Sequence, residues 1–373
     1  MSGGMIGIFT ESSLNRVRDL ADYYHELCAQ IVLGDELGFD FFATTQSYGR
    51  DFPDTTFSVS PNPLALFASQ IPNTTRIKML TAITIAAFHH PGMALSDFAT
   101  IDMLSGGRVI IGVGRGHPWL FGRMGIDQGE SRERLAEFCR MSAEILRAPT
   151  ARHTIKGKFW QLDDFELMPN FARDPEVYVA VTTSIESVLE AAEHGFGIMI
   201  PSYVGLPIEM VEANVAAYQE AYQKKWGVPG RHLIGVHFFA GPDEAAAREH
   251  GARALAEQFR VFARNMIEFG DRTGSQYPAY REIGSTFAHL ADPERCATAV
   301  ESGWPRLLAI WGDDKRCIAR IGEIIERIRP TGLILNIDSG GLEFHLVAGA
   351  MRYTAQKILP AMRAMLGDGG YRR

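Results

Sequence analysis

Short runs of apolar, often β-branched residues alternate along the chain with longer stretches in which apolar residues recur every three or four positions. The short runs are typical of strands, and the longer stretches are typical of amphipathic helices. Because strands that are buried on both faces are apolar throughout, the runs predict a parallel sheet covered by helices. The eight predicted strands span 5–9, 39–44, 77–86, 109–113, 177–181, 198–201, 233–239 and 333–337.

The helical periodicity is clearest in three segments, 131–147, 314–329 and 346–362. Pro330 directly follows the second of them and predicts its end. Eight strands alternating with helices predict an α/β fold, a single (β/α)₈ TIM barrel with insertions. An open, doubly wound sheet with the same number of strands remains the alternative.

Two stretches exceed what a minimal barrel requires. Residues 148–175 contain a predicted hairpin at 153–162, and residues 240–310 are helical in their first part. Both are long enough to cover the mouth of a barrel. Since no linker, low-complexity tract or internal repeat divides the chain, we expect one domain over 1–373 with an insertion at 240–310.

Composition narrows the class of protein. A chain of 373 residues lies within the range of one barrel with insertions. Its net charge of −7 argues against a basic footprint for nucleic acid. The four cysteines are far apart and form no Cys-x-x-Cys pair, so we expect reduced thiols and no metal site. No run of 18 apolar residues and no signal-like start occur, and we expect a cytoplasmic protein without a membrane segment.

A glycine-rich segment, Gly112-Val-Gly114-Arg115-Gly116, follows the fourth predicted strand. Glycines let the backbone approach a ligand closely, and Arg115 offers a forked donor for a phosphate. His117 stands where the third glycine of a dinucleotide fingerprint would fall, so the segment is not that motif. A tight turn with a solvated arginine explains it equally well.

Three hydroxyl residues, Thr182, Thr183 and Ser184, lie between the fifth predicted strand and a helix that ends at Gly195. Thr183 with Glu186 fits a capping box, which by itself would explain the hydroxyls. A helix N-terminus with free N–H groups also favours an anion. The two interpretations are compatible, because a cap and a phosphate can share one terminus.

His90 lies in a His-His-Pro segment after the third strand. Adjacent histidines point in different directions and are poor joint metal ligands. His90 therefore either faces a pocket or lies at the surface. The segments expected for common hydrolases, P-loop kinases and zinc proteases are absent from the sequence.

Together these segments resemble the luciferase-like, flavin-dependent monooxygenase family, and the segment after the fourth strand is most similar to the bacterial luciferase α subunit. The match runs over most of the chain and is weakest between 205 and 305. The stretches that carry the resemblance are 36–40, 101–108, 112–116, 121–122, 131–132, 312–318 and 340–360.

The resemblance implies a TIM barrel that binds flavin at the carboxyl ends of its strands. It places Gly114 beside the isoalloxazine and a non-proline cis peptide under the flavin near Ala82–Ile83. The residues that the resemblance assigns to the cofactor are Thr81, Ala82, Gly114, Arg115, Arg132, Thr182, Thr183 and Ser184.

One departure from the family pattern concerns proton handling. Many members carry Glu-His-His after the second strand, and this chain has Gln46-Ser47-Tyr48 there. Tyr48 and His90 are the remaining catalytic candidates. Tyr48 would hydrogen-bond a peroxyflavin or substrate oxygen, and His90 would face the pocket and tune it. The ordinary pKa of tyrosine, about 10, makes Tyr48 a poor base at neutral pH.

The resemblance further implies a two-component monooxygenase. A separate NAD(P)H:flavin reductase would supply reduced FMN, which would capture O₂ as a C4a-peroxyflavin and oxygenate a small organic substrate. Family members usually pair through helices beside strands 2 and 3, so we expect a homodimer that uses parts of 62–105. The alternatives are a coenzyme F420-dependent oxidoreductase that transfers hydride and a non-catalytic flavin-binding relative.

Overall fold

Eight parallel strands close into a barrel in the computed structural model, which describes residues 4–14, 19–201, 205–274, 279–304, 306–307, 309–339 and 341–369. Because β11 pairs with β14 on one side and with β9 on the other, the ring is closed and the predicted barrel is confirmed. The strands in ring order are β1 (Met5–Thr10), β2 (Phe41–Thr44), β3 (Lys78–Thr81), β5 (Val109–Gly114), β8 (Glu176–Ala180), β9 (Gly197–Ile200), β11 (His232–Ala240) and β14 (Gly332–Asp338).

The third predicted strand, 77–86, is divided in the structure. It forms β3 and the two-residue β4 (Thr84–Ile85), and both pair with β5. The peptide bond between Ala82 and Ile83, which lies between β3 and β4, is cis as predicted. Residues 82 and 83 thus separate β3 from β4.

The barrel interior is a separate apolar cluster from the layer between strands and helices. Gly112 of β5 lies against Thr81 and Met199, and a Cβ on Gly112 would stand 1.9 Å from the backbone oxygen of Thr81. Only glycine fits there. The buried members of the interior cluster are Phe9, Phe41, Ala43, Leu80, Ile110, Tyr178, Met199, Leu233 and Ile334.

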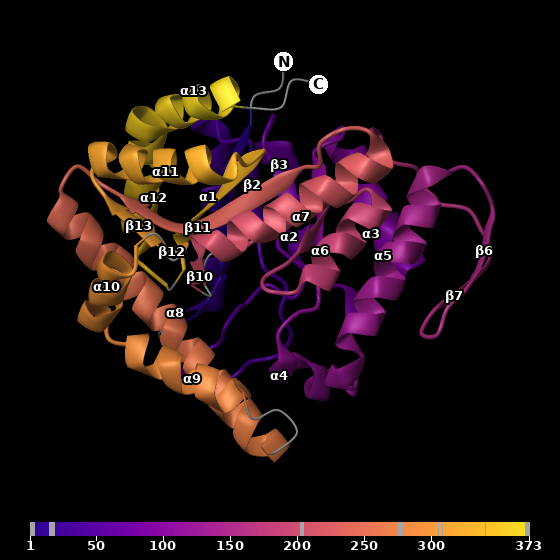
Figure 1. The fold of residues 1–373 in the computed structure, drawn as a ribbon, viewed down its shortest axis with the longest axis horizontal. Coiled ribbons are helices and arrows are strands. Elements are labelled where there is room, and N and C mark those ends of the chain that lie inside the picture. Colours follow the sequence, from indigo (N-terminus) through magenta and orange to yellow (C-terminus); the bar gives the residue numbers. More distant parts are fainter. Residues whose placement is uncertain are drawn as a thin grey trace.

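Helices surround the barrel (Figure 1). The predicted helix 131–147 is confirmed as α5 (Ser131–Arg147), and the predicted helix 314–329 is confirmed as α11 (Asp314–Ile328). The third predicted segment forms α12 (Phe344–Tyr353), a π-helical turn (Thr354–Ile358) and α13 (Leu359–Gly369). The remaining helices of this layer are α1 (Leu20–Glu36), α2 (Pro63–Gln70), α3 (Pro91–Ser105), α6 (Ile185–His194) and α7 (Ile208–Trp226).

The segment 240–310 leaves the barrel after β11 and forms α8 (Glu244–Thr273), α9 (Ala279–Leu290) and α10 (Pro293–Ser302). Figure 1 shows these three helices in orange along one side of the molecule. The segment then returns through β12 (Arg306–Leu307), which pairs with β10 (Leu206–Pro207), and β13 (Ala309–Gly312), which pairs with the carboxyl end of β11. Its end therefore extends the sheet.

The predicted hairpin forms β6 (His153–Lys156) and β7 (Gln161–Phe165), but it does not cover the barrel mouth. The Glu137 carboxylate on α5 accepts hydrogen bonds from the backbone nitrogens of Lys158, Phe159 and Trp160. These bonds hold the hairpin against the outside of the helical layer, beside α5 in Figure 1. The expectation that this stretch could cover the mouth is wrong.

All four cysteines are free thiols, and three of them are buried, as the sequence predicts. Within the described ranges, no helix is both long and apolar enough to cross a bilayer. The same residues include no group of three or more His, Cys, Asp or Glu side chains arranged to hold a metal ion. Gly340, part of the 340–360 stretch, lies outside the described residues.

Candidate active site

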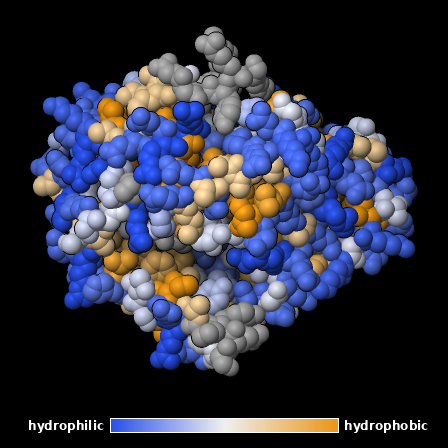
Figure 2. Space-filling view, in the orientation of Figure 1, coloured by the Kyte–Doolittle hydropathy of each residue, from blue (hydrophilic) through white to orange (hydrophobic). Residues whose placement is uncertain are grey.

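A cavity of about 470 Å³ opens at the carboxyl ends of the barrel strands. Figure 2 shows a hollow beside the α8–α9 pair, with hydrophobic side chains on its rim. The residues that line the cavity and come directly after strands are Glu11, Thr45, Gln46, Ala82, Ile83, Arg115, Gly116, Thr182, Thr183 and Pro201. Helices α8 and α9 contribute Phe262, Met266, Tyr280, Ile283 and Phe287. The segment 240–310 therefore covers the mouth.

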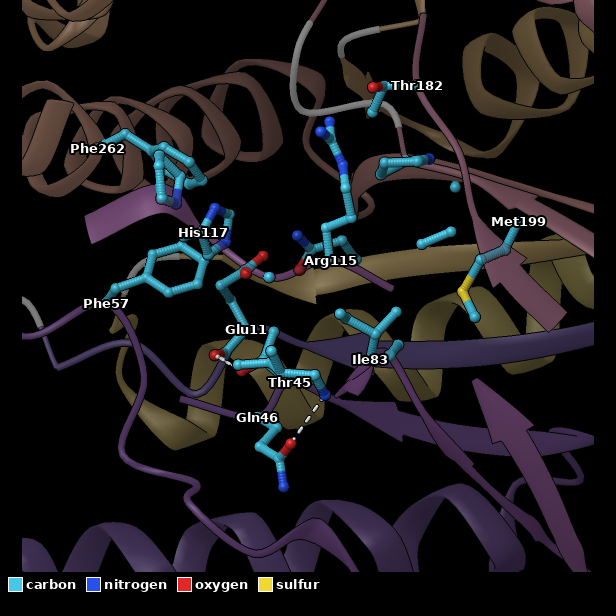
Figure 3. Close-up of a pocket in the computed structure, with 18 of the residues that line it drawn as sticks. Glu11, Thr45, Gln46, Phe57, Ile83, Arg115, His117, Thr182, Met199 and Phe262 are labelled. Carbon is cyan, nitrogen blue, oxygen red and sulfur yellow. Dashed lines mark hydrogen bonds between the residues drawn. The ribbon is translucent and has the colours of Figure 1, made fainter. Parts of the chain in front are cut away.

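The floor of the cavity is apolar. Ile83 and Met199 lie on one side of it, opposite the aromatic side chains (Figure 3). Gly114 lies behind Ile83, where a Cβ would stand 2.8 Å from Ile83 Cδ1. The buried hydroxyl of Thr81 accepts a hydrogen bond from the backbone nitrogen of Gly112 and donates one to its backbone oxygen. Thr81 thus supports the floor from below, and it does not line the cavity.

Arg115 extends from the end of β5 toward Thr182 (Figure 3). Burial lowers the pKa of this guanidinium, and the nearby positive charge of Arg132 lowers it further. No carboxylate of the described part of the chain lies within ion-pair distance of Arg115. A cation in this setting is stabilised by an anionic ligand.

Arg132 and Ser184 are in contact, as the predicted phosphate site requires. Arg132 Nη1 donates to Ser184 Oγ at 3.0 Å and to Glu186 Oε2 at 3.4 Å. Ser184 Oγ also accepts from the nitrogen of Ser187, so Ser184 is the N-cap of α6. The capping box predicted from Thr183 and Glu186 is therefore wrong by one residue, since α6 begins at Ile185.

Thr182 and Thr183 line the cavity between β8 and α6. The side chain of Asn214 on α7 donates to the backbone oxygen of Thr182 at 2.9 Å, which fixes the loop. Arg115, Thr182 and Thr183 thus face one space, and the N-terminus of α6 lies beside it. The structure brings this part of the predicted site together.

Tyr48 and His90 lie outside the cavity lining. The Tyr48 hydroxyl is 3.5 Å from His89 Nε2, which is 3.0 Å from Gln46 Oε1. Of these three residues, Gln46 is the one that lines the cavity. Burial raises the pKa of Tyr48, so it stays protonated.

His90 has a structural role. Its Nδ1 accepts from the nitrogen of Gly92 at the start of α3, and its Nε2 lies 3.1 Å from the backbone oxygen of Gln161 in the hairpin. Both ring nitrogens are therefore engaged outside the barrel. His90 is therefore not among the residues that line the cavity, in contrast to the expectation that it faces a pocket and acts as a catalytic group.

A carboxyl group that the sequence analysis missed lies inside the cavity. Glu11 follows β1, and Gln258 Nε2 of α8 donates to its Oε2 at 2.8 Å. Burial raises the pKa of Glu11 to about 8, and the Gln258 hydrogen bond lowers it only in part. The one signal in the sequence is a charged residue directly after an apolar strand, at the end where barrel sites lie.

Aromatic side chains form the wall opposite the floor. Phe57 and Phe262 pack edge-on against the His117 ring, which stacks on Trp119 with centroids 4.5 Å apart. Burial lowers the pKa of His117 to about 4, although Asp51 opposes the shift. His117 is therefore neutral at pH 7 and acts as part of an uncharged wall.

The cavity has two chemically distinct ends. The end near α6 is lined by Arg115 and the Thr182 and Thr183 hydroxyls, with the N-terminus of α6 and Arg132 beside it, and these groups suit an anionic group. The end near α8 and α9 is aromatic and aliphatic, and the Glu11 carboxyl lies among these side chains. Such a cavity can hold a cofactor by its anionic part and an apolar molecule beside it.

The family model described as luciferase-like monooxygenase matches residues 5–331. The chain belongs to the luciferase-like monooxygenase family.

Two relatives in this family use different cofactors. The chain is 24% identical over 287 residues to the oxygenase component of a flavin-dependent trigonelline monooxygenase from Acinetobacter baylyi, covering 75% of this chain and 73% of that protein. It is 27% identical over 297 residues to an F420-dependent glucose-6-phosphate dehydrogenase from Beutenbergia cavernae, covering 76% and 86%.

Solved structures show the same fold. The monooxygenase RslO1 from Streptomyces bottropensis matches with a TM-score of 0.78 and 21% identity, covering 95% of this chain and 99% of that one. The oxygenating constituent of 3,6-diketocamphane monooxygenase from Pseudomonas putida, solved with FMN, matches with a TM-score of 0.72 and 16% identity, covering 96% and 98%. At this identity the likeness concerns the fold.

Proposed function

We propose that this oxidoreductase is the oxygenase of a two-component, FMN-dependent monooxygenase that oxygenates a small organic substrate. The observation that carries the proposal is Arg115, a partly buried cation without a carboxylate partner in the described ranges, at the carboxyl end of a barrel. Arg132, Ser184 and the N-terminus of α6 lie beside it.

The residues present fit FMN. Its phosphate suits Arg115, Arg132 and the hydroxyls at 182–184, because arginine forks and helix N–H groups both favour such an anion. Its ring suits the apolar floor, where Ile83 and Met199 face the cavity. When bound in reduced form, FMN supplies the electrons that activate O₂.

The chain's own residues bind, orient and exclude water. Phe262 of α8 and Phe287 of α9 close the mouth, and they contact each other with ring centroids 5.7 Å apart. The neutral His117 and its aromatic neighbours keep this end of the cavity apolar. Exclusion of water protects a reactive flavin from unproductive decay.

The description of the trigonelline relative as an oxygenase component supports a separate reductase as the source of reduced FMN. A second candidate is an F420-dependent dehydrogenase. The match to the F420-dependent relative covers 86% of that protein, and the match to the trigonelline relative covers 73% of that one. The same cationic end would hold the F420 phosphate. The two candidates differ in whether O₂ is consumed.

Anaerobic titration with reduced FMN, oxidised FMN and F420, followed by oxygen uptake, tests the proposal. We expect reduced FMN to bind and a model flavin reductase with NADH to support substrate-dependent oxygen uptake. Preferential F420 binding without oxygen uptake would favour the dehydrogenase instead. Binding of FMN without any turnover across a broad substrate panel would favour a non-catalytic flavin-binding protein.

A further inference from the structure

We propose that Glu11 is a protonated hydrogen-bond donor to the substrate, and that the substrate is an uncharged, largely apolar molecule with an accepting oxygen. This inference rests on the proposed function, since it assigns the substrate of the same cavity. It gives Glu11 the role of a specificity-determining residue.

The backbone of Glu11 is fixed from two sides. Its nitrogen donates to the oxygen of Asp338 at 3.1 Å, and its oxygen accepts from Thr45 Oγ1 at 2.7 Å. These bonds hold the first residue after β1 between β14 and β2. The side chain is thereby directed into the cavity, next to His117 (Figure 3).

The carboxyl group has one hydrogen-bond partner for its two oxygens. Gln258 donates to Oε2, and no side chain of the described ranges donates to Oε1. Glu11 is only 1% exposed and forms no ion pair with any residue that the structure describes. Because an ionised carboxylate with a single neutral donor is poorly solvated, the protonated form is favoured.

The charged and titratable groups of the surrounding elements do not change this state. Arg115 after β5, His117 in the same loop and Tyr280 of α9 line the cavity, and the buried Asp338 ends the neighbouring β14. None of them contributes to the shift of the Glu11 pKa to about 8, which comes from burial and Gln258. At pH 7 the group on Oε1 is therefore an O–H donor.

The surroundings of Glu11 select an uncharged partner. Phe57, Phe262 and Phe287 lie around the same end of the cavity and offer no counter-charge to an anion. An O–H donor within an apolar wall binds a carbonyl or ether oxygen strongly, because the alternative is an unsatisfied buried group. Acetophenone has this chemistry, and benzoate and benzylammonium are its matched anion and cation.

The test begins with FMN affinity, measured by fluorescence quenching, so that loss of flavin binding counts against the proposed function alone. Calorimetric titration of the FMN-loaded protein with the three probes then follows at about pH 6.5. We expect acetophenone to bind best. Glu11→Leu should weaken that binding by about tenfold, whereas Glu11→Gln, which keeps a donor, should stay within about threefold.

The pH dependence and a spectroscopic measurement complete the test. Acetophenone affinity should fall in the wild-type protein as pH rises through about 8 and stay flat in Glu11→Gln. Infrared difference spectra at pH 7 should contain a protonated carboxyl band that Glu11→Gln removes. Glu257→Gln, a half-buried carboxyl on α8 outside the cavity lining, is the matched control and should leave both readouts unchanged.

Three results would overturn the inference. The first is tighter binding of benzylammonium than of acetophenone, since it would make Glu11 an anion that selects a cation. The second is absence of acetophenone binding, or equal binding by wild type and Glu11→Leu. The third is absence of the protonated carboxyl band, which tests the inference even if Glu11→Leu does not fold.

Discussion

Arg132 Nη1 donates to Ser184 Oγ at 3.0 Å, and this bond joins the first turn of α5 to the N-cap of α6. Glu186 accepts from the same Ser184 oxygen at 2.7 Å. Arg132 also lies close enough to Arg115 to lower its pKa. A bound anion would offset both positive charges, which is the basis of the proposed phosphate site.

The first prediction tests whether Arg132 binds the FMN phosphate or serves only its surface ion pair with Glu186. Arg132→Ala should weaken FMN binding by roughly threefold to tenfold, because the contact is charge-assisted but half exposed. Glu186→Gln should leave FMN affinity unchanged or higher, since it releases Arg132 from its carboxylate. Fluorescence titration at low salt measures both. Unchanged FMN affinity in Arg132→Ala would show that the arginine serves only the ion pair.

The second prediction concerns the pH dependence of stability. The pKa of Glu11 rises from 4.5 to about 8 on folding, so the folded protein holds this proton more tightly. The stabilisation is complete below about pH 4.5 and is lost as pH rises through about 8. Relative to Glu11→Gln, the wild-type free energy of unfolding should fall by at most about 1.4 kcal/mol per pH unit in this range.

Urea denaturation of both proteins at pH values between about 5 and 9 measures the difference. Above about pH 8 the two curves should become parallel, because Glu11 is then ionised in the folded and unfolded states. Curves that stay parallel over the whole range would contradict a protonated Glu11 in the folded protein.

The third prediction compares two glycines of β5. Gly112→Ala would place a Cβ 1.9 Å from the Thr81 backbone oxygen, whereas Gly114→Ala would meet the end of the Ile83 side chain at 2.8 Å. Gly112→Ala should therefore cost about 3 kcal/mol or more of unfolding free energy, and Gly114→Ala much less. Thermal denaturation distinguishes them. Equal losses would mean that the barrel interior adjusts more than its packing indicates.

The fourth prediction concerns assembly. We expect a homodimer through α2 and α3, because α3 exposes Met93 by 69% and Leu104 by 64%. Leu104→Glu should shift the protein to a monomer in light scattering at micromolar concentration. Val228→Glu, at a residue 53% exposed between α7 and β11, is the control and should stay dimeric. A monomeric wild-type protein would contradict this expectation.

Much of the barrel could be predicted from the sequence, because strands buried on both faces are continuously apolar. All eight predicted strands correspond to barrel strands, although the third is divided at Ala82–Ile83. The four-residue β13 was not predicted, because it follows a segment with a helical sequence pattern. This strand pairs only with the end of β11. Its position depends on how 240–310 folds back.

Site residues could be predicted from the sequence only where they follow a barrel strand in the chain. Arg115 and Thr182 directly follow strands, and the barrel fold alone brings such residues to one mouth. Glu11 and Gln258 meet across 247 positions because α8 crosses that mouth, and no local pattern encodes the contact. The environment of His90 has a similar origin, because the hairpin that engages its ring lies about 70 residues further along the chain.

The most direct test of the flavin site compares FMN and riboflavin, which differ in the phosphate, on wild type and Arg115→Ala. We predict that the substitution weakens FMN binding by roughly tenfold to a hundredfold, at about 1.4 kcal/mol per tenfold, because it removes a shielded charge-assisted contact. Riboflavin binding should change far less. Equal losses for both ligands, or no loss for either, would contradict a phosphate site at Arg115 and with it the position of the flavin.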